Sequence, residues 1–321
     1  MSGVCLVYAT RGTDWDQVGV ALRGASIGWC LAVIGLSVSC HVLRAERWRV
    51  LLRPVGDVPR WPTIAATFIG FGANALLPLR LGELVRPAFL ARRVGIGLSP
   101  TISSIVLERI FDTLLVICCF FAVGVVYEVP ETLRKGAYVL GVGAGGALLV
   151  LVLMARHRAT AERVLRRVLD VLPSRVGHAI WSIADGLLQG LGGLADFRIV
   201  ALVLLYSVVL WSMITLTYTW SFLAMDVQIP LLAGSLVTVV IVAASVFLPQ
   251  APGFVGTWQA GCVFALHVVF GVPHDVAVGY SLLTWVIQMV ANVGAAVVGL
   301  SLEGVSLREL VQQGRQEVPE A

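Results

Sequence analysis

The stretch SPTISSIVLERIFDTLLVICCFFAVGVV, residues 99–126, places Glu108, Arg109 and Asp112 inside a long apolar run. About 20 mainly apolar residues allow a helix to cross the hydrocarbon core of a membrane. A charged side chain at that depth costs about 2.5–3.5 kcal/mol on insertion scales, so it faces the protein interior and usually has a function. The stretch therefore predicts a membrane helix that carries a buried, charged site.

The composition of the whole chain agrees with a membrane protein. Of its 321 residues, 58% are hydrophobic and 13% are charged, and the mean hydropathy is +0.89. These values exclude a disordered chain, a disulfide-rich secreted module and an ordinary soluble enzyme. We expect an all-α, polytopic membrane bundle of about seven to eight apolar segments. These segments lie near 27–43, 62–79, 99–126, 137–155, 199–224, 229–248, 255–271 and 276–301.

The apolar segments are expected to form a single membrane domain over residues 1–301, followed by a short polar tail at 302–321. Within the domain, residues 156–197 form a polar-apolar insert with a basic, amphipathic pattern. Such a pattern is typical of a helix that lies on the cytoplasmic lipid surface, although a connecting hairpin explains it equally well.

Arginines gather in three clusters, at residues 44–60, 80–93 and 156–175. Cytoplasmic loops of membrane proteins are rich in Lys and Arg, so all three clusters are expected on the cytoplasmic side of the cytoplasmic (inner) membrane. The first two clusters flank segment 62–79, and a single spanning helix would separate them. Because glycines and Pro78 interrupt this segment, we expect a re-entrant hairpin that keeps both flanks on one side. A short, broken spanning helix is the alternative.

A second group of charges follows the interrupted segment, in NALLPLRLGELVRP at residues 74–87. Arg80, Glu83 and Arg86 are three residues apart, which places them near one face of a helix. Together with the charges of residues 99–126 they form a set of three arginines and three carboxylates. An arginine can bond two phosphate oxygens at once, so the set predicts a site for an anionic group. A purely structural ion-pair network is the alternative reading.

The stretch FLPQAPGFVGTWQ at residues 247–259 breaks a long apolar region that carries no charge. We expect a broken or re-entrant helix near 249–271, because proline and glycine interrupt the helical hydrogen bonds there. Pro78 and Gly82 give the earlier segment a similar pattern, which is a weak sign of an inverted-repeat transporter. The interrupting residues of the later segment are Pro249, Pro252, Gly253 and Gly256.

Motifs for catalysis and for metal binding are absent from the sequence. There is no Ser-His-Asp order, no phosphate-binding loop and no metalloprotease motif, and the six cysteines have no zinc spacing. We therefore expect a protein that is not an enzyme and that has no metal, no cofactor and no nucleic-acid partner.

Three motifs resemble the lysylphosphatidylglycerol synthase transmembrane family, also called flippase-like domain proteins. They are NALLPLRLGELVR at 74–86, ERIFD at 108–112 and PGFVGTWQ at 252–259, and RAERWRVLL at 44–52 also fits. The likeness covers nearly the whole chain. Leu79 and Phe254 stand where the family often has Gly, and Gln259 replaces a Glu, which puts proton coupling at position 259 in doubt. The matching positions are Asn74, Pro78, Arg80, Gly82, Glu83, Arg86, Glu108, Arg109, Asp112, Pro252, Gly253, Gly256 and Gln259.

The resemblance implies that the chain moves an anionic lipid, of phospholipid or polyprenyl-phosphate type, across the cytoplasmic membrane. Lipid aminoacylation is not expected, because the soluble aminoacyl-transferase domain of some relatives is not found in this sequence. The alternative function is a non-transporting membrane subunit that docks a glycosyltransferase or another lipid-modifying enzyme. The resemblance assigns head-group binding to Arg80, Arg86, Arg109 and Asn74, and ion pairing or proton coupling to Glu83, Glu108 and Asp112.

Overall fold

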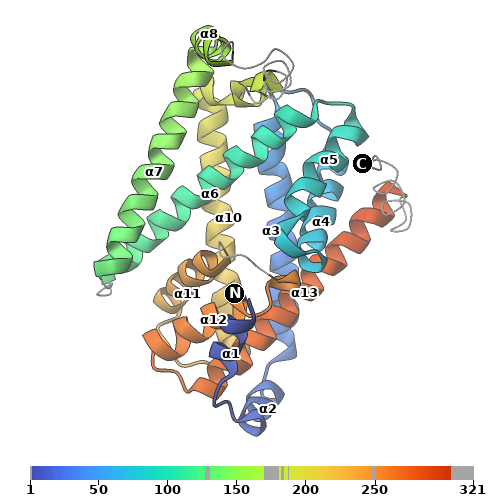
Figure 1. Cartoon of the computed structure of the whole chain (residues 1–321). Coiled ribbons are helices and arrows are strands. Elements are labelled where there is room, and N and C mark those ends of the chain that lie inside the picture. The colour runs from blue at the N-terminus through green and yellow to red at the C-terminus, as the bar shows by residue number, and fades with distance from the viewer. Residues whose placement is uncertain are drawn as a thin grey trace.

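The computed structural model describes residues 2–126, 131–169, 181, 184–186, 188–246 and 251–304. Every regular element within these ranges is a helix, which confirms the all-α class (Figure 1). The first helices are α1 (Ser2–Thr10), α2 (Trp15–Arg23), α3 (Ile27–Leu52), α4 (Arg60–Leu76), η1 (Pro78–Arg80), α5 (Gly82–Val94) and α6 (Leu98–Val126). They are followed by α7 (Glu131–Arg156), α8 (Arg158–Leu169), η2 (Leu191–Ala195), α10 (Phe197–Ala224), α11 (Leu231–Val246), η3 (Pro252–Phe254), α12 (Thr257–Val263), the π-helix η4 (Phe264–Val269) and α13 (His274–Glu303).

Three of the described helices, α3, α10 and α13, are long and apolar enough to cross a membrane. A fourth span results if α7 and α8, which meet at 103°, are counted as one bent span. The described helices thus do not confirm the predicted seven to eight segments. Several of the predicted apolar segments form short helices. Segment 62–79 forms α4, which ends at Leu76, and segment 255–271 is divided between α12 and η4.

Helices α3 and α10 lie side by side and run in opposite directions. The amide of Ser26 at the start of α3 donates to the carbonyl oxygen of Ala224 at the end of α10. Near the other end, Arg47 of α3 donates to Ser207 of α10 at 2.9 Å. Each of these two helices is followed in the chain by a helical hairpin, so the hairpins enter from opposite ends of the molecule (Figure 1).

The first hairpin consists of α4, η1 and α5, residues 60–94. Pro78 prevents α4 from continuing because it has no amide hydrogen to donate, and Leu77 before it is extended. The two helices then pack without space between them. A methyl group added at Gly82 would overlap the carbonyl oxygen of Gly70 and lie 2.6 Å from Oδ1 of Asn74. Glycine at position 82 therefore allows α5 to fold back directly onto α4.

The second hairpin consists of α11, η3, α12 and η4, residues 231–269, of which 247–250 lie outside the described residues together with Pro249. Its turn places Gly253 and Gly256 at positive φ angles of 67° and 87°. The side chain of Gln259 accepts a hydrogen bond from the amide of Gly256 at 2.7 Å and so caps α12. A Cβ atom placed on Gly253 would lie 3.3 Å from the carbonyl oxygen of Ala75 in α4, so the turns of the two hairpins meet.

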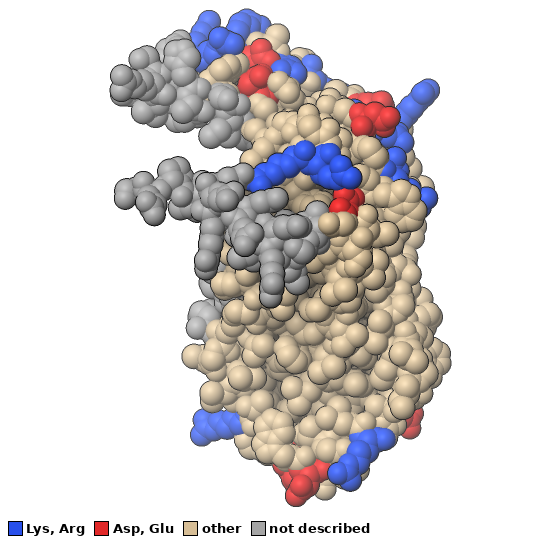
Figure 2. Space-filling model, turned by 90° about the vertical axis from the view of Figure 1, so that its right-hand side faces the viewer, with Lys and Arg blue, Asp and Glu red and all other residues tan. Residues whose placement is uncertain are grey.

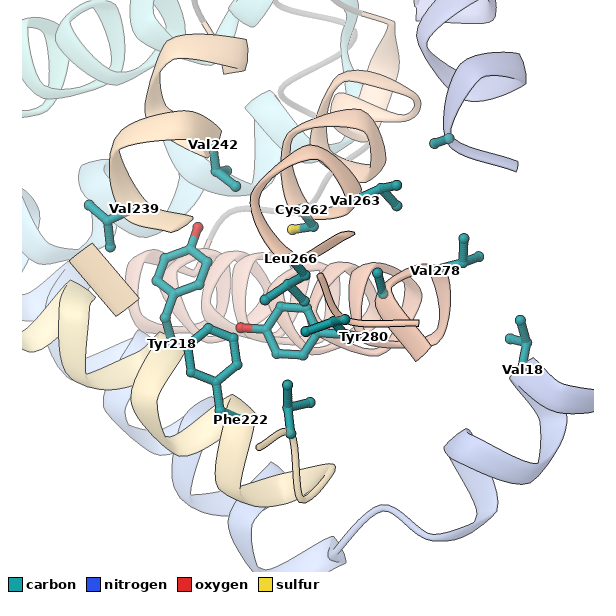
Figure 3. Packing of buried hydrophobic residues seen from close by; sticks show 14 of the residues in the cluster. Val18, Tyr218, Phe222, Val239, Val242, Cys262, Val263, Leu266, Val278 and Tyr280 are labelled. Carbon is teal, nitrogen blue, oxygen red and sulfur yellow. The ribbon is translucent and has the colours of Figure 1, made fainter. Parts of the chain in front are cut away.

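The largest hydrophobic core holds the second hairpin against α10 and α13 (Figure 3). Phe222 of α10 and Tyr280 of α13 stack with ring centres 5.0 Å apart, and both side chains are buried. Val239 and Val242 of α11 and Cys262 and Leu266 of the returning helices complete this core. This packing fixes the second hairpin without the use of charged groups.

Charged residues gather toward the ends of the molecule on the face that Figure 2 shows, and a broad band between them has none. The two flanks of the first hairpin lie together, because a Cβ atom on Gly56 would lie 3.7 Å from the Ile96 side chain. Arg93, at the end of α5, pairs with Glu303. Helix α8 forms within the predicted insert, and α13 continues to Glu303, into the range predicted as a tail, while residues 305–321 lie outside the described residues.

Candidate functional site

A buried layer of two arginines and two carboxylates lies between α3, α5 and α6. Arg47 and Glu108 have fully buried side chains. The guanidinium of Arg47 donates to both oxygens of Asp112, at 2.6 and 3.2 Å, and lies 3.3 Å from Glu108. This bidentate geometry is the strongest arrangement for an arginine and a carboxylate. We call Arg47, Arg86, Glu108 and Asp112 the buried layer.

The buried layer also ties the first hairpin to α6. Arg86 of α5 donates to Glu108 at 3.1 Å, and its guanidinium lies 4.0 Å from the ring centre of Trp48. On the other side of the layer, Asp112 accepts a hydrogen bond from the indole of Trp211 in α10 at 3.2 Å. The layer therefore joins four helices, and the carboxylates lie within ion-pair distance of Arg86 and Arg109.

A second set of charges faces a cavity. Arg44, Arg80, Glu83 and Arg109 have side chains that are 14%, 29%, 30% and 32% exposed, and we call them the cavity-facing group. Several of their contacts with carboxylates are long, at 3.8 Å for Arg44 and Asp112 and 3.5 Å for Arg80 and Glu83. Arg109 is held more firmly, at 2.8 Å from Glu108.

The excess positive charge lies in the cavity-facing group. The buried layer contains two arginines and two carboxylates, so its charges balance. The cavity-facing group contains three arginines and one carboxylate, which leaves a net charge of +2. These two sets are the charged side chains that the described residues contribute to this site. The surplus makes the cavity attractive to an anion.

The cavity consists of adjoining hollows that share lining residues. Arg80 and Arg109 line two of them, and Arg44 lines two. The largest has an empty volume of about 950 Å³, which includes the part that opens outward. Opposite the arginines, the wall is apolar and comes from α10 and the second hairpin, where the rings of Tyr218 and Trp258 stack 6.4 Å apart. Val239, Val242 and Ala243 line the same hollow as Arg44, Arg80 and Arg109.

The turn of the first hairpin fixes the position of Arg80. Its backbone is left-handed, with a φ angle of 58°, which costs a non-glycine residue about 1–2 kcal/mol. Such strain is typical of positions that a function requires. Asn74 is buried beside this turn and lines the same hollow as Arg80, Glu83 and Arg86. Gly82 allows the close packing that brings these residues together.

Arg44 and Arg47 lie inside the molecule, a position that the sequence, in which both belong to a basic cluster beyond the apolar segment, did not predict. Helix α3 continues to Leu52, well beyond the apolar segment predicted at 27–43, and carries both arginines into the interior. Their spacing of three residues and the apolar Trp48 and Leu51 beside them are the signals that could have revealed a buried face.

The interrupting residues of the second hairpin lie apart from the ion pairs. Pro252, Gly253 and Gly256 form its turn, and Gln259 bonds the backbone of that turn. Phe254 of this turn lines one hollow together with Arg80 and Arg109, so the two turns share a cavity. Within the described ranges, no group of three or more His, Cys, Asp or Glu residues is arranged to hold a metal ion.

Comparison with known proteins identifies the family. A family model described as Lysylphosphatidylglycerol synthase TM region matches residues 1–296, which include both hairpins and the whole charged site. Neither the curated proteins nor the solved structures gave a match. The match and the apolar helices show that the chain is a membrane protein. It belongs to the family of the lysylphosphatidylglycerol synthase TM region.

Proposed function

We propose that the protein moves an anionic lipid across the cytoplasmic membrane and binds the lipid phosphate at Arg44, Arg80 and Arg109. The observation that carries the proposal is the net charge of +2 on the cavity-facing group, opposite an apolar and aromatic wall. A lipid has the matching character, with an anionic head group and apolar chains. Arg86 and Asn74, to which the family resemblance also assigns head-group binding, lie deeper beside the same hollow.

The charged cluster has two interpretations, a structural ion-pair network and an anion-binding site. The buried layer fits the first interpretation, and the cavity-facing group fits the second. Arg47 already has two bonds to Asp112, so it serves to position the helices. Arg80 and Arg109 are about a third exposed and can turn toward a phosphate. Each charge-assisted hydrogen bond to the phosphate contributes about 1.5–3 kcal/mol. Of the carboxylates, Glu83 is the most exposed and is the best placed to exchange a coupling proton.

Both hairpins are proposed to be re-entrant. Helix α4 has 17 residues, which gives a length of about 26 Å, and its hairpin returns to the end where it began. With α3, α6, α7, α10 and α13 as spans, the two hairpins bring the number of apolar segments to seven. The arginines at the open end of the first hairpin favour the cytoplasmic side for that end. Single cysteines at Arg60 and Arg92 should then react with a membrane-impermeant reagent from the same side, and reaction from opposite sides would refute re-entrance.

The arrangement suggests how a lipid passes. The hairpin turns meet between Ala75 and Gly253, beside hollows lined by Arg80 and Phe254. Separation of the turns would let the head group move past the arginines while the acyl chains remain along the apolar wall. Inverted hairpins around a central site are a common design for alternating access.

Transport by the purified protein tests this proposal. Liposomes that contain the protein and labelled phosphatidylglycerol should move the label between leaflets, and R109Q should slow the movement about tenfold through the loss of phosphate bonds. R198Q, which removes an exposed arginine at the start of α10, should transport normally. Folded wild-type protein that moves no anionic lipid would contradict the proposal and favour the subunit that docks a lipid-modifying enzyme. Zwitterionic lipids should compete poorly, because their ammonium group meets the arginines.

A further inference from the structure

The largest hollow of the cavity, beyond Arg44, has mainly apolar walls that carry several neutral polar groups, and Arg44 is the charged residue among the described residues that line it. We call it the neutral pocket. Its walls come from α3, α10 and α13, with aromatic side chains such as Phe71 and Trp258 between them. Among the described residues that line it there is no Asp or Glu. Its polar members are Ser37, His41, Thr217, Ser221, Thr284, Gln288 and Asn292.

The hydrogen bonds of His41 leave one nitrogen ready to accept. Oδ1 of Asn292 lies 2.9 Å from Nε2 of His41 and accepts a further bond from Gln288 at 2.9 Å. Because this amide oxygen can only accept, Nε2 of His41 carries the hydrogen and Nδ1 has a free lone pair. That Nδ1 atom is buried and has no partner within the part of the chain that the structure describes. His41 is held in place by stacking on Phe71, with ring centres 4.4 Å apart.

The hydroxyl groups of the neutral pocket add further acceptors. Thr217 and Ser221 donate their hydrogens to carbonyl oxygens of their own helix, at 2.6 and 2.7 Å. Their oxygen lone pairs remain able to accept hydrogen bonds. Neutral acceptors of this kind suit the hydroxyl groups of a ligand, which can donate hydrogen bonds to them. An ammonium group would lose its water there without a carboxylate to compensate.

We propose that the neutral pocket binds the uncharged, hydroxyl-bearing part of a lipid head group, such as a glycerol or a sugar. This inference rests on the proposed function, since the phosphate of the same lipid would lie at the cavity-facing arginines. Arg44 connects the two sites because it lines both the neutral pocket and the hollow that contains Arg80 and Arg109. The substrate class is therefore a polyhydroxylated anionic lipid rather than an aminated one.

Binding of two matched lipids to the full-length protein tests the assignment. Phosphatidylglycerol and phosphatidylethanol each carry one phosphodiester charge, and their head groups differ by the two hydroxyls and one carbon of the glycerol. The wild-type protein in nanodiscs should bind phosphatidylglycerol about fivefold more tightly, as expected for one or two neutral hydrogen bonds. Q288L and S37A should each reduce this ratio toward one and leave the affinity for phosphatidylethanol unchanged.

S39A is the matched control for S37A, because Ser39 lies on the same helix as Ser37 but is exposed and donates to the carbonyl oxygen of Gly35 at 2.8 Å. It should keep the wild-type ratio. Equal affinity of the wild-type protein for both lipids would overturn the neutral pocket as a subsite, and so would variants that weaken both lipids equally. In either case the proposed function would stand if R109Q weakened both lipids. Binding that is insensitive to R109Q would instead refute the phosphate site.

Discussion

The two hairpins share a shape but differ in chemistry. Each turn holds a non-glycine residue in the left-handed region, Arg80 at a φ angle of 58° and Phe254 at 61°. The first turn and the start of α5 carry Arg80, Glu83 and Arg86, whereas the stretch 247–259 around the second turn carries no charge. Both hairpins thus keep the same backbone strain, and only one of them carries charge. Under the proposed function, the first hairpin binds the head group and the second shapes the wall that faces it.

The two hairpins are also held in place by different forces. Arg86 joins the first hairpin to Glu108 of α6 by an ion pair in the buried layer. The second hairpin packs through a hydrophobic core around Phe222 and Tyr280 (Figure 3). Loss of a single charge should therefore affect the first hairpin far more than the second.

The largest effect is expected from E108Q. The substitution removes the charge that Arg47, Arg86 and Arg109 surround. Arg47 and Arg109 keep Asp112 as a partner, whereas the buried guanidinium of Arg86 loses the carboxylate with which it pairs. Removal of one partner of a buried ion pair typically destabilises a protein by about 3–5 kcal/mol. Thermal unfolding in detergent and the folded yield should both show the loss. E131Q, which breaks the exposed pair of Glu131 with Lys135, is the control and should change little. Equal losses in both variants would contradict the separate role of the buried layer.

A smaller effect is expected from G82A, which tests the close packing inside the first hairpin. The added methyl group would overlap the carbonyl oxygen of Gly70, and overpacking of this kind costs about 1–3 kcal/mol. G145A is the control, because a Cβ atom at Gly145 in α7 meets nothing within 4 Å. It should be neutral or slightly stabilising, as alanine favours helix. A G82A protein as stable as wild type would mean that α4 and α5 are less closely packed.

The smallest effect is expected at the strained positions that the turns share. At Arg80 and at Phe254, glycine should be more stable than alanine by about 1 kcal/mol, because only glycine adopts positive φ without strain. Thermal unfolding of R80G against R80A, and of F254G against F254A, separates the cost of the positive φ angle from the effect of losing the side chain. Alanine as stable as glycine at one turn would show that the two turns differ in backbone as well as in charge.

An ion-pair network that includes Glu108 and Asp112 was one of the two readings that the sequence left open, because charged groups at that depth are costly without partners. The sequence did not predict Arg47 as their main partner, since an arginine just after an apolar run resembles a loop residue. The contacts of Ser207 and Trp211 with this layer also had no local signal, because they depend on how α10 packs against α3.

The arrangement of the hairpins was only partly predictable. Proline and glycine marked both breaks, and the recurrence of Pro78 and Pro249 suggested related halves. The contact between Ala75 and Gly253 joins residues far apart in the chain, and nothing in either segment alone specifies it. Hydropathy likewise does not distinguish a short helix of a hairpin, such as α4, from a helix that spans the membrane. The number of apolar segments predicted from the sequence is therefore larger than the number of described helices that are long enough to span.

The net charge of +2 in the cavity also determines how an electrical potential acts on the protein. The charges of Arg44, Arg80 and Arg109 are fixed to helices, so a voltage across the membrane does work on the mobile head group. For one elementary charge that crosses the whole membrane, 100 mV corresponds to about 2.3 kcal/mol, or roughly a fiftyfold difference in equilibrium distribution. Under the proposed function, the fixed arginines lower the barrier for the anionic head group without adding any direction of their own. Under the proposed function, the membrane voltage alone can therefore drive an anionic lipid toward the positive side.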